Sequence, residues 1–175
     1  MKFKFLSLVA AAGLFLASCG TTYTSTSDNA AYNVTVPADI RSDFVVAYPD
    51  ATNIVWNRYD AATVPIDWEL SGWTVLDPND YAVTFNMGPD TYYAWYDSDG
   101  NLVGTTYAIT DHTKLPYAIN SMLATKYKGY TIETVQREMY KSQTAYELKL
   151  KQGDDMKIKL LVDANGNILK EKLKD

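Results

Sequence analysis

Cysteine and histidine each occur only once in the chain, as Cys19 and His112. A single cysteine excludes an internal disulfide, and a zinc site needs three or four His, Cys or carboxylate ligands. Neither HExxH nor CxxC occurs, and there is no glycine-rich phosphate loop. A catalytic triad would have to use His112, which lies in a linker between two halves of the chain. The sequence therefore predicts no catalytic residue, no metal site and no cofactor.

Carboxylate pairs are present, but their positions are typical of turns. Asp97 with Asp99, and Asp154 with Asp155, fall in predicted tight turns, where Asp bonds to nearby backbone N–H groups. Read as a calcium loop from Asp97, the segment lacks the glycine at position 6 and the glutamate at position 12 that an EF-hand requires. A weak calcium site, or an enzyme that uses Asp97 and Asp99, remains an alternative to the hairpin turn.

Long hydrophobic runs are also missing, apart from a short one near the N-terminus. Lys2 and Lys4 precede an apolar stretch over 5–16, which is shorter than the ~20 residues that span a bilayer. A basic start followed by a short apolar core predicts a signal peptide over 1–18. The segment Leu16-Ala17-Ser18-Cys19 resembles the lipobox of bacterial lipoproteins, which implies cleavage before Cys19 and lipid attachment to it, with palmitate among the acyl groups. An ordinary signal peptide with an incidental cysteine is the alternative.

Residues 19–33 are rich in Thr, Ser and Asn and predict a flexible tether. The whole chain carries a net charge of −5; without Lys2 and Lys4 it has 14 basic and 21 acidic side chains, or −7. Such a balance argues against nucleic-acid binding and against electrostatic attraction to anionic lipid, so the acyl anchor is the only expected attachment to a membrane. No acidic run follows Cys19, so a periplasm-facing envelope protein is expected. The sequence leaves inner membrane, outer membrane and surface exposure open.

An internal repeat organises the predicted domain over 34–175. Pro37, Ile40, Ser42, Phe44 and Tyr48 match Pro116, Ile119, Ser121, Leu123 and Tyr127 at a constant offset of 79. Each of these segments has helical spacing, with Pro suited to the first turn. A strand follows each, over 52–59 and 131–140, and further strands end in matching Asp-x-(Asp/Asn)-Gly-Asn turns. The first half carries about 14 extra residues between Asp60 and Asp80. We expect two repeats, over about 36–109 and 114–173.

Alternation of apolar and polar residues assigns the faces of the strands. In the second half Leu148, Leu150, Ile158, Leu160 and Val162 alternate with Glu147, Lys149, Lys151, Lys157 and Lys159, which predicts a half-buried antiparallel sheet covered by the helix over 117–127. In the first half the same pattern predicts Val83, Phe85, Tyr93 and Trp95 inside. It predicts Ala82, Thr84, Tyr92 and Tyr96 on the outer face.

Several motifs together resemble a known family: Pro37-x-x-Ile40, Tyr48-Pro49-x-Ala51, Tyr81-x-Val83-x-Phe85 and Trp95-Tyr96-Asp97-x-Asp99-Gly100-Asn101-Leu102. The chain resembles the PepSY-like, beta-lactamase-inhibitor-like secreted bacterial proteins over roughly 36–173. The resemblance implies an α+β fold similar to that of beta-lactamase inhibitory protein, a tandem repeat of helix plus four-stranded antiparallel sheet. Its motifs are turns and core aromatics, so the resemblance identifies no inhibitory residue and leaves open whether a beta-lactamase or protease is inhibited.

Aromatic residues give the remaining functional hypothesis. Tyr59, Trp73, Tyr92 and Tyr96 are predicted on the outer face of the first half or in its insertion, and Tyr and Trp favour interfaces. They are the candidate ligand-binding face of a non-enzymatic envelope lipoprotein that recognises a protein, peptide or glycan. The alternative is that these aromatics pack internally and that the protein is a structural or accessory lipoprotein with no dedicated ligand.

Overall fold

The computed structural model describes residues 34–153 and 156–174. The predicted signal peptide (1–18), the tether (19–33), Cys19 and the pair Asp154–Asp155 lie outside these residues. The helices are α1 (Ala38–Ala47), α2 (Trp68–Ser71) and α3 (Tyr117–Lys126), with 3-10 turns η1 (Ala61–Thr63) and η2 (His112–Lys114). The strands are β1 (Thr52–Arg58), β2 (Tyr81–Met87), β3 (Asp90–Tyr96), β4 (Leu102–Ala108), β5 (Thr131–Tyr140), β6 (Gln143–Gln152), β7 (Met156–Asp163) and β8 (Ile168–Lys174).

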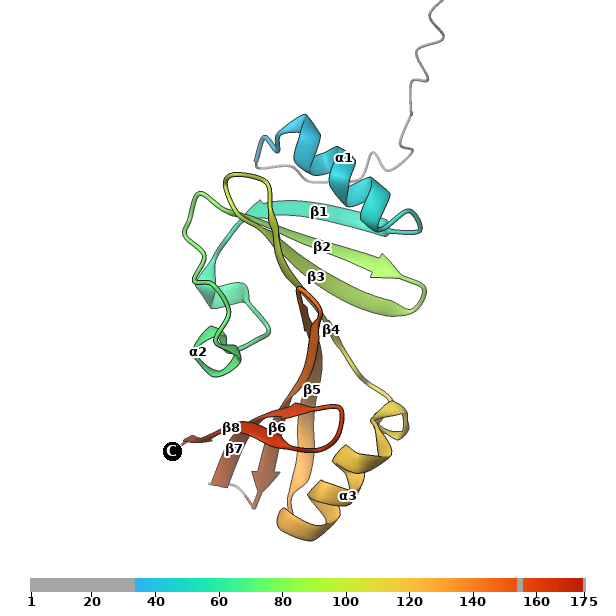
Figure 1. Ribbon diagram of the computed structural model, residues 1–175, viewed down its shortest axis with the longest axis vertical. Coiled ribbons are helices and arrows are strands. Elements are labelled where there is room, and N and C mark those ends of the chain that lie inside the picture. Colours follow the sequence, from blue (N-terminus) through green and yellow to red (C-terminus); the bar gives the residue numbers. More distant parts are fainter. Residues whose placement is uncertain (1–33, 154–155, 175) are drawn as a thin grey trace, which may run out of the picture.

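All eight strands belong to one antiparallel sheet in chain order, β1 to β8. The predicted α+β class is confirmed, but the strands form a single sheet and not two four-stranded ones. The reason is the pairing of β4 with β5, in which Thr105 lies opposite Met139 and Ala108 opposite Gln136. The molecule is elongated, with α1 and α3 toward opposite ends and α2 on the other side of the sheet (Figure 1).

Two clusters of buried side chains lie under α1 and α3, on what we call the helix face of the sheet. Ile40 and Phe44 of α1 pack against Val83 and Phe85. Under α3, Ile119 and Met122 pack against the alternating apolar residues of β6 and β7, as predicted, namely Leu148, Leu150, Ile158, Leu160 and Val162. Burial of these side chains is the main source of stability, at about 1.5–3 kcal/mol for each large apolar residue.

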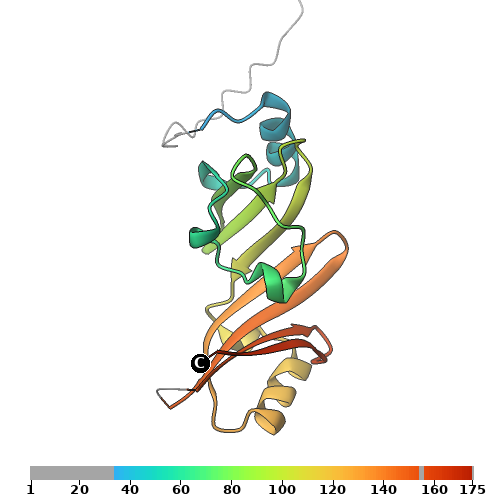
Figure 2. The ribbon, with the colours of Figure 1, turned by 90° about the vertical axis from the view of Figure 1, so that its left-hand side faces the viewer.

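The other side of the sheet, which we call the outer face, is covered in the first half by residues 59–76. Tyr59, Ile66, Leu76, Trp95 and Val103 form a third buried cluster there. Ile66 and Leu76 of this cluster belong to the predicted insertion, which contains η1 and α2 (Figure 2). Both faces of the first half are therefore covered over most of their area within the monomer.

The predicted face assignment of β3 is wrong. Tyr96 is 2% exposed and packs with Tyr92 in the cluster under α1, whereas Tyr93 and Trp95 lie on the outer face. The cause is the two-residue turn Gly88-Pro89, which places Met87 opposite Asp90 and Val83 opposite Ala94. Odd-numbered residues of β2 therefore share a face with even-numbered residues of β3, because side chains alternate along each strand.

Candidate functional site

Lysines gather on the outer face of the second half. Lys149 lies directly opposite Lys159, and Lys159 lies opposite Lys172 on the edge strand β8. Lys151 and Lys157 form a second such pair. Like charges directly opposite one another destabilise a sheet. We call this surface the lysine face, and its members are Lys149, Lys151, Lys157, Lys159, Lys170 and Lys172.

Helix α2 rests on this face although it comes from the first half of the chain. Asp67 caps the helix, since its side chain accepts a hydrogen bond from the Leu70 N–H at 3.1 Å. Gly72 ends it at φ 68°, the left-handed conformation that glycine adopts most readily. This tight cap at both ends allows a helix of only four residues to hold its acidic side chains in place.

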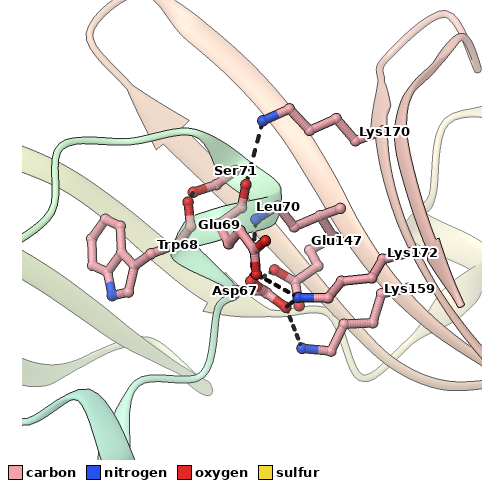
Figure 3. Close-up of polar contacts among 9 residues, drawn as sticks. All are labelled: Asp67, Trp68, Glu69, Leu70, Ser71, Glu147, Lys159, Lys170 and Lys172. Atoms are coloured by element: carbon pink, nitrogen blue, oxygen red, sulfur yellow. Dashed lines mark hydrogen bonds and ion pairs between the residues drawn. The ribbon is translucent and has the colours of Figure 1, made fainter. Parts of the chain in front are cut away.

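The acidic side chains of α2 and its cap pair with lysines across the interface (Figure 3). Asp67 Oδ2 lies 2.8 Å from Lys159 Nζ and 3.7 Å from Lys172 Nζ. Glu69 Oε2 accepts from Lys172 Nζ at 2.7 Å. Burial is the largest single influence on Asp67 and opposes its ionisation. The hydrogen bonds from Lys159 and the Leu70 N–H, together with the charges of Lys159 and Lys172, outweigh it and lower the pKa of that carboxyl. The Asp67–Lys159 pair is only 14% exposed on either side, so solvent screens it less than the Glu69–Lys172 pair.

Two buried carboxyl groups lie beneath α2. Glu147 Oε2 accepts a hydrogen bond from the backbone N–H of Asp67 at 2.7 Å, and Glu147 and Glu138 are each 1% exposed. Burial raises the pKa of both groups, and the neighbouring Glu147 adds to the effect on Glu138, whose pKa rises to about 9. Lys159 and the Asp67 N–H favour the charged form of Glu147. At neutral pH Glu138 therefore keeps its proton.

Tryptophans hold the insertion against the sheet. The ring centroid of Trp68 is 5.1 Å from that of Trp95 and 5.4 Å from that of Trp73. Trp73 also stacks on Tyr140 of β5 at 5.4 Å, so the aromatic cluster reaches the second half. Gly104 makes room for it, because a Cβ there would lie 2.4 Å from the Trp73 ring.

Of the four aromatic residues predicted as a ligand-binding face, the structure brings two to the outer face. Tyr59 is 9% exposed under the insertion, and Trp73 packs in the aromatic cluster. Tyr92 and Tyr96 lie on the helix face, and Tyr96 is buried. The four residues do not form a common surface, because Tyr92 and Tyr96 lie on the helix face and Tyr59 is buried under the insertion on the other side of the sheet.

The predicted turn at Asp97 and Asp99 is a hairpin turn. Asp97 accepts hydrogen bonds from the N–H and side chain of Asn101, and Asp163 does the same for Asn167. His112 begins η2 in the linker. Within 34–153 and 156–174, no three His, Cys, Asp or Glu side chains cluster as metal ligands would.

The residues that sequence reasoning missed are Asp67, Glu69 and Glu138. The alternation of apolar and polar residues correctly predicted that Glu147 and the lysines of β6 and β7 lie on the same face of the sheet, which is the outer face. Nothing in the local pattern indicated that an insertion 80 residues earlier in the chain would bury Glu147. An excess of lysines on one strand face, set against acidic residues in the insertion, was the available signal.

The comparisons with known proteins agree on the fold. The structure is similar to two DUF2874 family proteins, one from Bacteroides uniformis (TM-score 0.64, 18% identity, 79% of this chain and 90% of that one) and one from Bacteroides ovatus (0.63, 22%, 80% and 89%). It is also similar to a BLIP-like protein from Bacteroides fragilis, with TM-score 0.63, 19% identity and coverage of 81% and 89%. At these identities the likeness concerns the fold alone. No curated protein matches the sequence.

No helix in the described part of the chain has both the length and the hydropathy needed to cross a bilayer. The family model described as beta-lactamase-inhibitor-like, PepSY-like matches residues 79–170, which is more than half of the 175 residues. The match includes the second half of the sheet up to β8, and with it most of the lysine face. The chain therefore belongs to the PepSY-like, beta-lactamase-inhibitor-like family.

Proposed function

We propose that the protein is a non-enzymatic binding module of the cell envelope whose lysine face recognises an acidic segment of a protein partner. The observation that carries this proposal is the seating of Asp67 and Glu69 on Lys159 and Lys172. In effect α2 is an internal acidic ligand that already occupies part of the surface. Its presence supports the idea that the remaining lysines can receive further carboxylates.

The remainder of the lysine face supports the choice of an acidic partner. Lys157 has only a 3.5 Å contact with Glu133, and both side chains are well exposed. Among the described residues, no carboxylate pairs with Lys149 within 4 Å. A concentrated positive surface on a chain of net charge −5 would attract an acidic partner.

A defined peptide pair tests the proposal. An acidic helical peptide and its Gln/Asn counterpart are titrated against the protein at two salt concentrations. We expect only the acidic peptide to bind, with affinity falling as salt rises. Replacing both Lys149 and Lys157 by Glu should weaken binding roughly tenfold, as two exposed pairs of about 0.5–1 kcal/mol each would predict.

The matched control changes charge by the same amount on the other side of the molecule. Lys126 and Lys128, at the exposed end of α3, are replaced by Glu. This variant should keep full affinity. If both double variants lose affinity for the acidic peptide equally, net charge and not the lysine face determines binding. If the parent protein does not bind the peptide, the accessory role without a ligand is favoured.

For its location, we propose that the protein is a lipoprotein anchored through Cys19 and facing the periplasm. The Leu16-Ala17-Ser18-Cys19 segment supports this proposal. So does similarity to a protein from Bacteroides eggerthii that is described as periplasmic (TM-score 0.61, 16% identity, 80% of this chain and 90% of that one). Growth with a clickable palmitate analogue should label the parent protein, and Cys19→Ser should abolish the label. A labelled Cys19→Ser variant would contradict the assignment.

We also infer that the two halves are copies of one unit, of which only the first acquired an insertion. Three correspondences support this inference: a helix before each set of four strands, the turns at Gly100 and Gly166, and two cross-strand Arg–Tyr pairs. Arg58 lies opposite Tyr81, and Arg137 lies opposite Tyr146. On this view the insertion of one copy became the internal ligand of the other.

A further inference from the structure

A row of aromatic and basic side chains crosses the helix face between the areas covered by α1 and α3. Tyr92, Tyr107, Arg137 and Tyr146 lie opposite one another on the successive strands β3, β4, β5 and β6. The rings of Tyr92 and Tyr107 stack with centroids 4.5 Å apart and planes at 25°. The row therefore forms a continuous surface at the middle of the sheet.

Arg137 is the unusual member of this row. Its guanidinium lies 5.9 Å from the centre of the Tyr107 ring, and Nη1 donates to the Tyr107 hydroxyl at 3.1 Å. Its Nε is buried and has no hydrogen-bond partner, and no carboxylate in the described part of the chain forms an ion pair with it. A buried donor on a charged group normally has a partner, because leaving it unsatisfied is unfavourable.

The matching arginine of the first half shows what a purely structural role looks like. Arg58 holds the same cross-strand relation to Tyr81 that Arg137 holds to Tyr146. It is exposed, lies over the Tyr81 ring at 4.4 Å and donates to the Asn79 carbonyl. Ring packing and a hydrogen bond to a backbone carbonyl explain the position of Arg58. For Arg137 the comparable contacts leave the buried Nε–H without an acceptor.

Arg137 opens into a cleft of about 230 Å³, lined also by Asp90, Tyr107, Asp111, Lys114 and Tyr146. At ~30 Å³ per water, this space is suited to a small ligand with a single ring. The guanidinium fork matches a carboxylate, and the tyrosine rings can contact the flat side of a ring. Asp90 and Asp111 disfavour a dianion such as phosphate by charge repulsion.

We propose that this cleft binds the carboxylate of a small ring-bearing ligand, with Arg137 as the anchoring cation and Lys114 at the rim. The site is independent of the lysine face, because Arg137 and Glu138 are consecutive on β5 and point to opposite sides of the sheet. Failure of one proposal therefore leaves the other standing.

The first test follows the Arg137 Nε–H resonance of the ¹⁵N-labelled full chain by NMR. Benzoate and glucuronate are the acidic probes, with benzamide and glucose as their neutral counterparts and inorganic phosphate as a further anion. We expect at least one of the two acids to shift this resonance with saturation, and the neutral counterparts to leave it unchanged. Benzoate alone would identify a planar aromatic acid, and glucuronate alone a sugar acid. No shift with either acid, or a shift with phosphate only, would overturn the proposal.

The second test uses the two arginines as a matched pair. Arg137→Gln should lower affinity for the acidic probe by roughly 10–100-fold, as expected for loss of a charge-assisted hydrogen bond, while Arg58→Gln should leave it unchanged. If Arg137→Gln fails to fold, Lys114→Gln replaces it, since Lys114 is exposed. That variant should weaken binding a few-fold with unaltered circular dichroism. Equal loss in Arg58→Gln, or full affinity in a folded Arg137→Gln or Lys114→Gln variant, would refute the assignment.

Discussion

At the scale of single residues, the most consequential side chain is Glu138. It is 1% exposed and lies beside the buried carboxyl group of Glu147. Burial and the adjacent Glu147 raise its pKa to about 9, so the folded protein holds a proton there that an unfolded chain releases near pH 4.5. Because the folded pKa lies above the unfolded one, this group contributes stability that is complete below about pH 4.5 and is lost as pH rises toward 9.

Glu138→Gln should remove most of this pH dependence. The variant keeps the shape of the protonated acid without the charge, so it should match the parent near pH 5 and exceed it by ~1–3 kcal/mol near pH 8.5. Urea unfolding at the two pH values measures the difference. Glu133→Gln, an exposed position on the same strand, is the control and should preserve the parent's slope. A parent whose stability does not fall across this range would contradict the raised pKa.

Gly166 is a second residue with a defined role, in the turn between β7 and β8. Its φ is 78°, and a Cβ there would lie 2.6 Å from the carbonyl oxygen of Ala118 in α3. Gly166→Ala should therefore destabilise the fold by about 2–4 kcal/mol, as a strained φ and a clash with backbone combine. Gly88→Ala has a similar φ of 59° with open space around it, and should lose only about 1 kcal/mol. Thermal unfolding compares them, and equal losses would show that strain alone acts.

At the scale of elements, the insertion between β1 and β2 determines what the outer face can do. It buries Trp95 in the first half and places Asp67 on Lys159 in the second. Asp67 forms three kinds of contact: a helix cap, an ion pair and a backbone bond to Glu147. It is therefore the residue through which α2 is held.

Asp67→Asn should loosen α2 without unfolding the sheet. The loss of an ionised cap and of a half-buried ion pair should lower stability by about 1–2 kcal/mol and speed hydrogen exchange at residues 66–72. Asp60→Asn is the matched control, since Asp60 caps η1 through the Ala62 N–H and forms no ion pair with the described residues of the second half. Unchanged exchange in Asp67→Asn would mean that the tryptophan cluster holds the insertion by itself.

How far the sequence predicts these elements depends on the range of the interaction. Local periodicity predicts the helices that follow Pro37 and Pro116. It also predicts the strand over 131–140 and the apolar face of β6 and β7. The predicted face of Tyr92 and Tyr96 was wrong for a reason of register. Alternation shows which residues of β3 share a face, but the Gly88-Pro89 turn determines whether that face is the helix face or the outer face. The docking of α2 on residues about 80–105 positions later has no local signature, so local periodicity could not predict the charge pairing of Asp67.

At the scale of the whole molecule, two connections join the halves: the β4–β5 pairing and the docked insertion. Neither half can lose its structure without exposing buried groups of the other, Glu147 among them. We expect one cooperative thermal transition with equal calorimetric and van't Hoff enthalpies. Two resolved transitions in calorimetry would show instead that the halves are stable separately.

An open sheet of eight strands in a single line has two unpaired borders, β1 and β8. On β8, Leu169 and Leu173 are 53% and 70% exposed, which makes this border a template for stacking of further chains. Lys170 and Lys172 stand beside these leucines, and their mutual repulsion keeps neighbouring molecules apart. Because Lys172 already pairs with Asp67 and Glu69, the insertion has weakened this protection, and the solubility of a complex depends on whether a partner bound at Lys149 and Lys157 also covers β8.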